Sequence, residues 1–449
     1  MTSHALLSKT SQVYDVEVYE ARDSPNFEIQ GPRSYSLGLN IRGQTAIKHF
    51  DVNNRSLGLY KTISQYGVLS ESFYLHIGKL KLQIRKPNNN NNNNKAASPP
   101  PTLMISRNKL VGALEQSGVQ CYGDRFKVKY NTKAVDIDLV KRKIYFSDGT
   151  ATDYDLLIGA DGVNSQVRKS MENQLGIKVE ETTLPGQYKV MQTKLPAALE
   201  PDSIHAMECT SKEKSNIGLF LIPSLQNETC VLINWRNEST VPSFFKDTKD
   251  DDISKIQDSI EKDFPLFGRP SKESVEILQK QSPSVALTIR ANSYACPSNG
   301  VLMLGDSAHS TGGTLGQGAN SGLLDVVNLG YLFSYLLTHS LTHSLTQLDR
   351  ILQENNDDIA KSLKEFSSSA VPEGLALWKL LQLPPKNKFF GLLYTITQAL
   401  SGILFKLFPA FCNGPIQTQL SQSMIPFSTI AKKNRFWIGL STNDTAFNL

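Results

Sequence analysis

One stretch of the chain constrains its fold most: residues 301–325, which read VLMLGDSAHSTGGTLGQGANSGLLD. Four apolar residues predict a buried strand, and a turn rich in Gly and Thr then leads into the start of a helix. Such a turn presents unpaired backbone N–H groups beside the positive end of a helix dipole, which favours an anion or a phosphate. Its glycines let a ligand approach the backbone closely; they are Gly305, Gly312, Gly313, Gly316, Gly318 and Gly322.

The carboxylate of Asp306 follows that strand directly, so it can accept hydrogen bonds from ligand hydroxyls. The alternative is a flexible loop in which Asp306 caps a helix. We favour ligand binding because the turn lies between an apolar strand and a helix.

A second turn of the same kind occurs in residues 154–171, which contain DLLIGADGVNSQVR. Asp161 and Gly162 follow an apolar strand, and Arg168 is on the helix behind them. Alone, this would be read as a strand-turn-helix with an Asp cap. Two such turns in one chain favour a shared ligand.

A third feature is VEVYEAR near the N-terminus, which predicts a strand that ends at Glu20. In dinucleotide-binding folds an acid at the end of the second strand accepts the two ribose hydroxyls. Glu20 fits that role, although an exposed acid at the end of a strand is also common.

The order of predicted elements divides the chain into four regions. We expect an α/β domain in 1–184, a β-rich block in 185–295, the last part of the α/β domain in 296–345, and helices in 346–449. An Asn-rich segment at 87–101 cannot build a core and predicts a disordered surface insertion. Because the β-rich block interrupts the α/β domain, we expect the ligand where the two meet.

Two local predictions can be checked directly. Residues 105–118 have apolar residues at helical spacing, and Gly118 is the predicted stop. Asp148 and Gly149 predict the turn of a hairpin.

Composition excludes some classes of function. The 449 residues carry a net charge of only +5, with Lys and Arg spread along the chain, so we expect no nucleic-acid partner. Five widely spaced cysteines, an odd number without a C-x-x-C motif, favour reduced thiols in an intracellular protein.

One segment points to a membrane. Residues 389–405, FFGLLYTITQALSGILF, carry no charge and are near the lower length limit for a membrane span. They also contain Thr, Gln and Ser, which favours a helix that is buried or lies at a membrane surface; a true span stays open. The C-terminal helices therefore admit a peripheral membrane contact.

Together these motifs resemble the flavin-dependent aromatic hydroxylases, most of all the kynurenine 3-monooxygenase-like proteins. The matching residues are VYEAR (18–22), RSYSLGLNIRGQTAI (33–47), SR (106–107), DLLIGADGVNSQVR (155–168) and GDSAH…GQGANSG (305–322). They run in the family's order and cover the chain from residue 1 to about 330. The resemblance implies an α/β protein with a Rossmann-like FAD-binding domain, an inserted antiparallel β-sheet substrate domain and C-terminal helices.

The resemblance also implies a role for each matching residue. Glu20, with Arg22 beside it, would hold the adenosine ribose, and Asp306 would take a ribityl hydroxyl. Asp161 and Gly162 would shape a turn that serves both the flavin and the nicotinamide cofactor. The remaining implied cofactor contacts are Arg42 and Arg107 at the phosphate and ribityl region, and Gly316, Gly318, Ala319 and Asn320 near the isoalloxazine ring.

The reaction implied by the family is hydroxylation of a small aromatic substrate. NAD(P)H would reduce FAD, O₂ would form a flavin C4a-hydroperoxide, and no protein nucleophile or metal would be needed. His309 adjoins the motif, and we expect it to be structural. By the same resemblance the protein would be cytoplasmic or membrane-associated, with the mitochondrial outer membrane as one location.

Two departures from the family bear on this expectation. The first is that the family opens with a strand and a Gly-x-Gly-x-x-Gly turn, whereas this chain begins just after the last glycine of that fingerprint. We interpret it as N-terminally truncated, either at an internal Met or by a missing exon. The alternative is a flavin-free pseudoenzyme or a truncated gene product.

The second departure concerns the substrate. Kynurenine enzymes are expected to have an Arg near the position of Phe73 that binds the substrate carboxylate, but residues 57–84 contain none. We therefore expect a related monooxygenase whose substrate need not be kynurenine. A flavin reductase or dehydrogenase without oxygen insertion remains a third reading.

Overall fold

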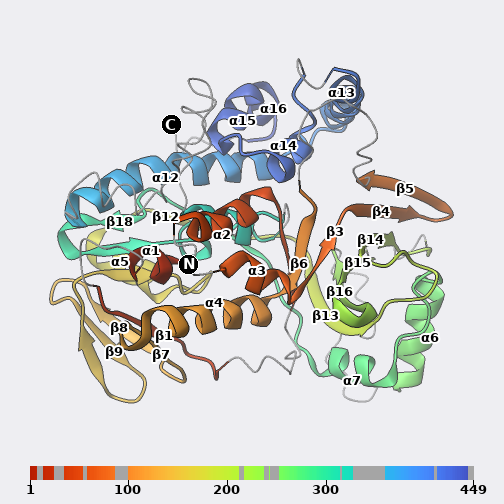
Figure 1. Ribbon diagram of the computed structural model, residues 1–449. Helices are drawn as coiled ribbons and strands as arrows, with labels where there is room; N and C mark the ends of the chain where they lie inside the picture. Colours follow the sequence, from red (N-terminus) through yellow and green to blue (C-terminus); the bar gives the residue numbers. More distant parts are fainter. Residues whose placement is uncertain are drawn as a thin grey trace.

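The computed structural model describes residues 1–7, 14–24, 35–53, 58–85, 100–211, 217–236, 242, 252–313, 316–326, 359–408 and 412–442. An α/β half lies beside a sheet domain, and helices from the C-terminal region run along one edge of both (Figure 1). The expected fold class is confirmed. The Asn-rich insertion falls outside the described residues except for its last two positions, and so does the whole segment 327–358.

Short strands in parallel pairs form the centre of the α/β half. β1 (Val16–Tyr19) runs parallel to β7 (Phe126–Lys129), and β11 (Leu157–Gly159) runs parallel to β19 (Val301–Met303). β18 (Ala295–Cys296) adds an antiparallel edge to β19. The predicted apolar strand before Asp306 is therefore real, and all of β19 is buried. Helices α1 (Thr2–Leu7) and α5 (Gln166–Leu175) pack beside these strands.

A second small sheet, with strand order β2-β6-β3, carries the helices that follow β1 in the chain. Its strands are β2 (Ser36–Leu39), β6 (Thr102–Ser106) and β3 (Gly67–Ser70), and its helices are α2 (Ile41–Asn53), α3 (Leu59–Ser64) and α4 (Arg107–Tyr122). Ser106 caps α4 by accepting a hydrogen bond from the amide of Lys109 at 3.3 Å.

Gly118 does not end helix α4, contrary to the prediction. The helix continues to Tyr122, and Gly123 ends it with a φ of 54°. A Cβ at Gly118 would lie 2.6 Å from the ring of Phe126, so this glycine is needed for close packing against β7.

Three antiparallel strands project from the α/β half: β8 (Ala134–Asp138), β9 (Lys143–Phe146) and β10 (Ala151–Asp153). A 3-10 turn, η1 (Gly123–Arg125), leads from α4 to β7. The predicted hairpin turn is confirmed between β9 and β10. Asp148 accepts a hydrogen bond from the amide of Thr150 at 2.9 Å, and Gly149 has a φ of 85°.

The sheet domain contains six strands in the order β13-β16-β15-β14-β4-β5. They are β13 (Gln187–Lys194), β16 (Glu228–Trp235), β15 (Ile217–Pro223), β14 (Ser203–Glu208), β4 (Ser72–Ile77) and β5 (Leu80–Arg85). All neighbouring pairs are antiparallel except β14 with β4. Helices α6 (Ile253–Asp263) and α7 (Lys272–Lys280) cover one face, and η3 (Leu225–Asn227) joins β15 to β16.

The sheet therefore extends beyond the predicted 185–295 block, because β4 and β5 come from the N-terminal region. A separate antiparallel pair, β12 (Val179–Thr183) and β17 (Leu287–Ala291), carries the chain into and out of the sheet domain. A short turn, η6 (Pro297–Asn299), connects β18 to β19.

The C-terminal part is helical, as expected. After α8 (Asp306–His309) and α9 (Gly318–Leu324), the described helices are α12 (Ile359–Leu381), α13 (Lys388–Leu407), α14 (Ile416–Gln422), α15 (Phe427–Lys433) and α16 (Arg435–Gly439). Helix α12 lies along the α/β half, whereas α13 and α16 stand outside the body of the molecule (Figure 1).

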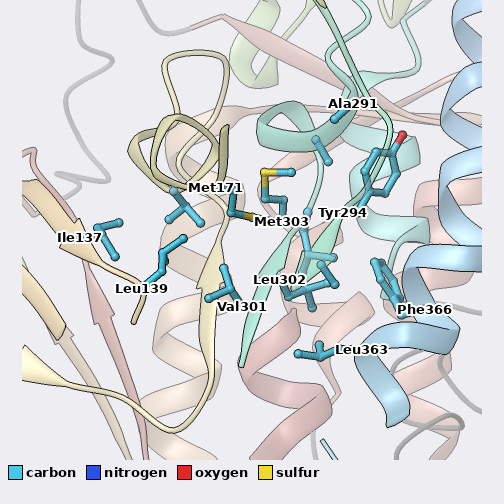
Figure 2. Close-up of a cluster of buried hydrophobic side chains, with 14 of the residues drawn as sticks. Ile137, Leu139, Met171, Ala291, Tyr294, Val301, Leu302, Met303, Leu363 and Phe366 are labelled. Atoms are coloured by element: carbon cyan, nitrogen blue, oxygen red, sulfur yellow. The ribbon is translucent and has the colours of Figure 1, made fainter. Parts of the chain in front are cut away.

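The core of the α/β half lies between β19 and helix α12. Figure 2 shows Leu363 and Phe366 of α12 beside Leu302, with Tyr294 above them. These side chains are buried, and burial of each large apolar group contributes about 1.5–3 kcal/mol. The packing fixes β19, and with it the turn that begins at Gly305.

Candidate functional site

A cleft of about 3140 Å³ separates the α/β half from the sheet domain. Its walls come from β1, β2 and β11, from the Gly-rich turn that precedes α9, from one face of the six-stranded sheet, and from α13 and α14. Nine of the eleven residues predicted to contact a cofactor line this cleft: Glu20, Arg22, Arg107, Asp161, Gly162, Asp306, Gly316, Gly318 and Ala319.

The two carboxylate-bearing turns lie side by side, as predicted. Pairing of β11 with β19 brings them together, and the amide of Leu304 donates to the carbonyl of Gly159 at 3.0 Å. The hydroxyl of Ser307 also donates to Gly159, at 2.6 Å. Asp161 and Asp306 therefore face one cleft.

Arg168 ties the two turns to each other. Its buried guanidinium donates to the carbonyl of Val163 at 2.6 Å and to the carbonyl of Ser307 at 3.0 Å. It also forms an ion pair with Glu181 at 2.5 Å. One side chain thus holds the turn after β11 and the turn after β19 in a fixed relation.

Asp306 is the first residue of α8, and solvent in the cleft reaches its carboxylate. Protein atoms nevertheless surround it closely, and this desolvation raises the pKa of Asp306. The nearby positive charges of His309 and Arg107 act in the opposite direction. The N-cap of α8 is Gly305, and no side chain caps this helix. The Asp306 carboxylate is therefore not used as a cap and can accept hydrogen bonds from hydroxyl groups in the cleft.

Asp161 has a different local role, which was the alternative reading of its motif. Its Oδ2 accepts hydrogen bonds from the amides of Gln166 at 2.7 Å and Val167 at 3.2 Å, at the start of α5. Gly162 follows with a φ of 75°, a conformation that favours glycine. Asp161 therefore shapes the turn, in addition to lining the cleft.

Glu20 lies just beyond β1, at the carboxyl end of the parallel pair β1–β7. Its amide donates to the carbonyl of Lys129 at 3.0 Å, and its Oε1 accepts from the amide of Arg22 at 3.0 Å. The side chain is partly exposed at the cleft wall. This is the position from which an acid can reach ribose hydroxyls.

Arg42 does not line the cleft. It is fully buried, and it donates from Nε to the carbonyl of Leu420 at 3.0 Å and from Nη2 to the carbonyl of Ile425 at 2.5 Å. It also stacks 4.3 Å above the ring of Phe427. Burial lowers the pKa of Arg42 to about 10, partly offset by Glu373. The structure thus assigns Arg42 to the contact between α2 and the C-terminal helices.

Asn320 does not line the cleft either, but it organises the turn beside it. Its Oδ1 accepts from the amide of Asn40 at 3.0 Å, and its Nδ2 donates to the carbonyls of Gly38 at 2.9 Å and Gly316 at 3.0 Å. These bonds join the end of β2 to the Gly-rich turn.

Asp325 is a residue that the sequence analysis missed. Its carboxylate accepts from the amide of Gly305 at 2.7 Å and lies 2.9 Å from Nε2 of His309. Burial alone would lower the pKa of His309, but the charge and hydrogen bond of Asp325, together with Asp306, raise it. The pair fixes Gly305 from behind, so His309 is structural, as expected.

The sheet end of the cleft is apolar. Phe73 and Phe220 line it and form an edge-to-face pair with ring centroids 5.8 Å apart. Residues 57–84 contain no arginine, yet Arg85 lies directly opposite Phe73 in the β4–β5 ladder. Arg85 also lines the cleft, and Nη2 donates to the carbonyl of Ser70 at 2.8 Å. Sequence position alone could not show that this register brings a cation to the place of Phe73.

Glycines at the centre of the cleft allow a flat ligand to approach the backbone. A Cβ at Gly162, Gly313 or Gly316 would meet no atom within 4 Å, and all three have positive φ. Gly322 is different, because its Cβ would come 3.3 Å from the Cα of Gly305. The open glycines, Asp306 and Glu20 fit the ring, ribityl and ribose parts of FAD.

The pyrophosphate region has a separate feature. Among the described strands, β1 pairs only with β7 and β11 pairs only with β19, and residues of both β1 and β11 line the cleft. Each strand thus has one ladder partner and one edge without a described neighbour.

Comparison with known proteins decides the family. The model of the family described as FAD binding domain matches residues 53–347. The chain belongs to this FAD-binding family.

Relatives within the FAD-binding family are named kynurenine 3-monooxygenase. One from Cryptococcus neoformans is 25% identical over 71% of this chain and 64% of its own length. Another, from Drosophila willistoni, is 22% identical over 94% of this chain and 85% of its own length. The first relatives are thus matched over slightly less than two thirds of their length.

Solved structures show the same fold at lower identity. 2-Methyl-3-hydroxypyridine-5-carboxylic acid oxygenase in its tetrameric form has a TM-score of 0.58, with 17% identity over 90% of each chain. Klebsiella pneumoniae HpxO, complexed with FAD and uric acid, has a TM-score of 0.57, with 15% identity over 98% of this chain and 95% of its own. The α/β domain with an associated sheet domain is therefore a fold that this chain shares with these two proteins.

Proposed function

We propose that this protein is an FAD-dependent monooxygenase that uses NAD(P)H and O₂ to hydroxylate a small aromatic substrate. The observation that carries the proposal is the single cleft that joins the two carboxylate-bearing turns to an apolar, aromatic-lined face of the sheet domain. Membership of the FAD-binding family and relatives named kynurenine 3-monooxygenase support it.

When bound, FAD would accept electrons from NAD(P)H and activate O₂, and the protein would supply binding, orientation and exclusion of water. Asp306 would accept a hydrogen bond from a ribityl hydroxyl, and Arg107 would contribute positive charge beside it. Glu20 would accept from the adenosine ribose. The positive-φ glycines would let the ring lie against the backbone of the turn.

The sheet face would hold the aromatic substrate. Phe73 and Phe220 offer ring contacts of the kind that stack on an aromatic ligand. Arg85 supplies a cation beside them, so the substrate class that fits best is an aromatic compound with an anionic substituent. The kynurenine enzymes were expected to have an arginine near the position of Phe73. Arg85 lies beside Phe73 in the sheet although it is twelve positions later in the sequence, so kynurenine is one candidate substrate among others.

The test begins with FAD. The purified chain is titrated with FAD and followed by flavin fluorescence, and NAD(P)H oxidation is then measured against a panel of aromatic carboxylates. We expect a yellow protein, substrate-stimulated oxidation and a hydroxylated product detected by mass spectrometry. Arg85→Gln should raise KM for anionic substrates about tenfold or more, with little effect on FAD affinity, because a charge-assisted hydrogen bond is lost.

Other outcomes identify the alternatives. A colourless protein that ignores FAD supports a flavin-free binding protein. A parallel sample extended at its N-terminus by a strand and a Gly-x-Gly-x-x-Gly turn then tests whether that segment restores FAD binding. NAD(P)H oxidation that yields only peroxide, with no hydroxylated product from any substrate, supports a flavin reductase instead.

A further inference from the structure

Two histidines on neighbouring strands of the six-stranded sheet contact each other through their ring nitrogens. Nε2 of His76 on β4 lies 3.1 Å from Nδ1 of His205 on β14, and both side chains are buried. Nε2 of His205 also lies 3.0 Å from the backbone carbonyl of Glu200, in the loop before β14. A carbonyl can only accept, so His205 donates from Nε2, and its Nδ1 accepts the hydrogen bond from Nε2 of His76.

The pair joins a hairpin to the rest of the sheet. Among the described strands, β4 pairs with β14 on one side and with β5 on the other, and β5 is the margin of the sheet (Figure 1). β5 is largely exposed, by 55% at Leu80 and 58% at Ile84. Segments with so little burial open at a low cost in free energy. Contacts between this hairpin and β14 therefore decide how often it opens.

Three side-chain contacts run from the hairpin to β14 and the loop before it, and each involves a titratable group. The first is the histidine pair. The ring of Tyr74 stacks on His205 with centroids 5.4 Å apart, and Lys81 of β5 forms an ion pair with Glu200. On the other side of β14, the residue of β15 opposite His205 is Leu221, which carries no charge. Among the described residues, the charges that act on the pair are those of Lys81 and Glu200.

Burial makes protonation of the docked pair costly. Desolvation lowers the pKa of His76 and the pKa of His205 below the ordinary value of 6.5; the positive charge of Lys81 acts in the same direction, and Glu200 acts against it. A proton added at Nδ1 of His205 would set two N–H groups against each other across the 3.1 Å gap. A proton added to His76 would keep the bond but place a buried cation near Lys81.

The hairpin also carries side chains of the cleft. Phe73 of β4 and Arg85 of β5 line the cleft, and so does Ile204 of β14. Because side chains alternate along a strand, His76 and His205 lie on the opposite face of the sheet. Movement of the hairpin away from β14 would therefore displace Phe73 and Arg85 without any chemical change inside the cleft.

We propose that His76 and His205 form an acid-sensitive latch that holds the β4–β5 hairpin against β14, and that protonation of the pair releases the hairpin. The histidines of the open hairpin take up protons near pH 6.5, whereas those of the docked hairpin resist protonation. The stabilisation of the docked state is therefore fully present above pH 6.5 and is lost as pH falls toward the lowered pKa values. The latch does not rest on the proposed oxygenase activity, because its test follows strands rather than turnover.

The test is amide hydrogen exchange of the full chain at pH 7.5 and at pH 5.5, read by mass spectrometry. Protection factors remove the intrinsic pH dependence of exchange. Peptides from β4 and β5 should lose protection roughly 10- to 100-fold at the lower pH, because each histidine that titrates only in the open form contributes up to about tenfold. Peptides from β13, β15 and β16 serve as the internal reference and should change much less.

Variants connect the effect to the pair. His76→Gln with His205→Gln removes both titrating rings, so the protection of β4 and β5 should be equal at the two pH values, whatever its absolute level. Lys81→Gln, at an exposed position, should make the acid-induced loss several-fold smaller, because a charge that opposes protonation of the docked pair is removed. His49→Gln removes a different buried histidine and is the matched control, which should keep the full loss.

Three results would overturn the proposal. The first is unchanged protection of β4 and β5 at pH 5.5. The second is an equal loss of protection in all six strands, which would show that acid unfolds the sheet domain as a whole. The third is an acid-induced loss that persists in the double glutamine variant. If that variant does not fold, the unmodified protein and Lys81→Gln still decide, since a loss that Lys81→Gln leaves unchanged also contradicts the latch.

Discussion

Asp161 and Asp306 come from nearly the same sequence pattern, but the structure uses them differently. Each follows an apolar strand and a glycine, and the two strands pair in parallel. Asp161 accepts two amide hydrogen bonds at the start of α5. Asp306 has no side-chain cap role in α8, and desolvation in the cleft raises its pKa.

The difference shows that a motif fixes where a carboxylate lies but not what it binds. The length of the turn decides this. After Asp161 the chain makes a four-residue turn before α5, so the carboxylate can reach back to the helix amides. After Gly305 helix α8 begins at once, so Asp306 is inside the first turn and its side chain is left to the cleft.

The largest effect should come from breaking both turns together. Arg168→Ala would leave the carbonyls of Val163 and Ser307 without their buried donor, and we expect a loss of about 3 kcal/mol in the free energy of unfolding. FAD affinity should fall as well, since both turns shift. Urea unfolding and flavin titration measure the two effects. Arg168→Lys is the control, and an unchanged stability of Arg168→Ala would disprove the bridging role.

Asp306→Ala should separate binding from stability. We expect FAD affinity to fall roughly 10- to 100-fold, the value of a hydrogen bond to a charged group. Because the folded protein raises the pKa of Asp306, its ionised form opposes folding at neutral pH, so the FAD-free variant should be no less stable than the original protein. Asp306→Asn, which keeps the shape of the side chain but removes its charge, is the matched control. If Asp306→Ala bound FAD normally, the carboxylate would not contact the cofactor.

Asp161→Ala should lower the stability of the protein more than its affinity for FAD. Ser165 remains the N-cap of α5, but the amides of Gln166 and Val167 lose their acceptor, so the free energy of unfolding should fall by about 1 kcal/mol, with a smaller effect on FAD affinity than that of Asp306→Ala. Thermal unfolding measures the loss, and Asp161→Ser, which can still accept a hydrogen bond, should restore most of it. A larger loss of FAD affinity at Asp161 than at Asp306 would reverse the comparison.

The smallest effect is the pH dependence of the His309–Asp325 pair. The folded protein raises the pKa of His309 above its ordinary value of 6.5. The pair therefore stabilises the fold fully below that value, and this contribution is lost as pH rises through the raised pKa. The difference in unfolding free energy between the original protein and His309→Gln should shrink with rising pH. A difference that grows with pH would contradict the assignment.

Local sequence signals predicted the elements that surround the cleft. The strands before Asp161 and Asp306, the hairpin at Gly149 and the helical C-terminal part were all visible as patterns of apolar residues and turn residues. β11 and β19 pair in parallel, so their carboxyl ends, each followed by a carboxylate-bearing turn, meet at one edge.

What the sequence could not show depends on contacts between distant segments. Arg42 was expected at the cofactor, yet its donors bind carbonyls nearly 400 residues away, on the C-terminal helices. Gly118 was predicted to end its helix because glycine is a common helix stop. The local sequence could not show that this glycine is instead needed for packing against Phe126 of β7. The place of Arg85 opposite Phe73 depends on strand register, and Asp325 carries no motif of its own.

Helix α13 is exposed on one side, yet Gly402 and Phe405 on its other side belong to the cleft wall. Should the helix rest on lipid, the occupant of the cleft and the bilayer would be two ligands of one element. Thermodynamic reciprocity then requires that any substrate whose entry strengthens lipid attachment be bound more tightly by the attached protein, by the same factor. In that case a membrane would regulate ligand binding in the cleft as well as determine where the protein is located.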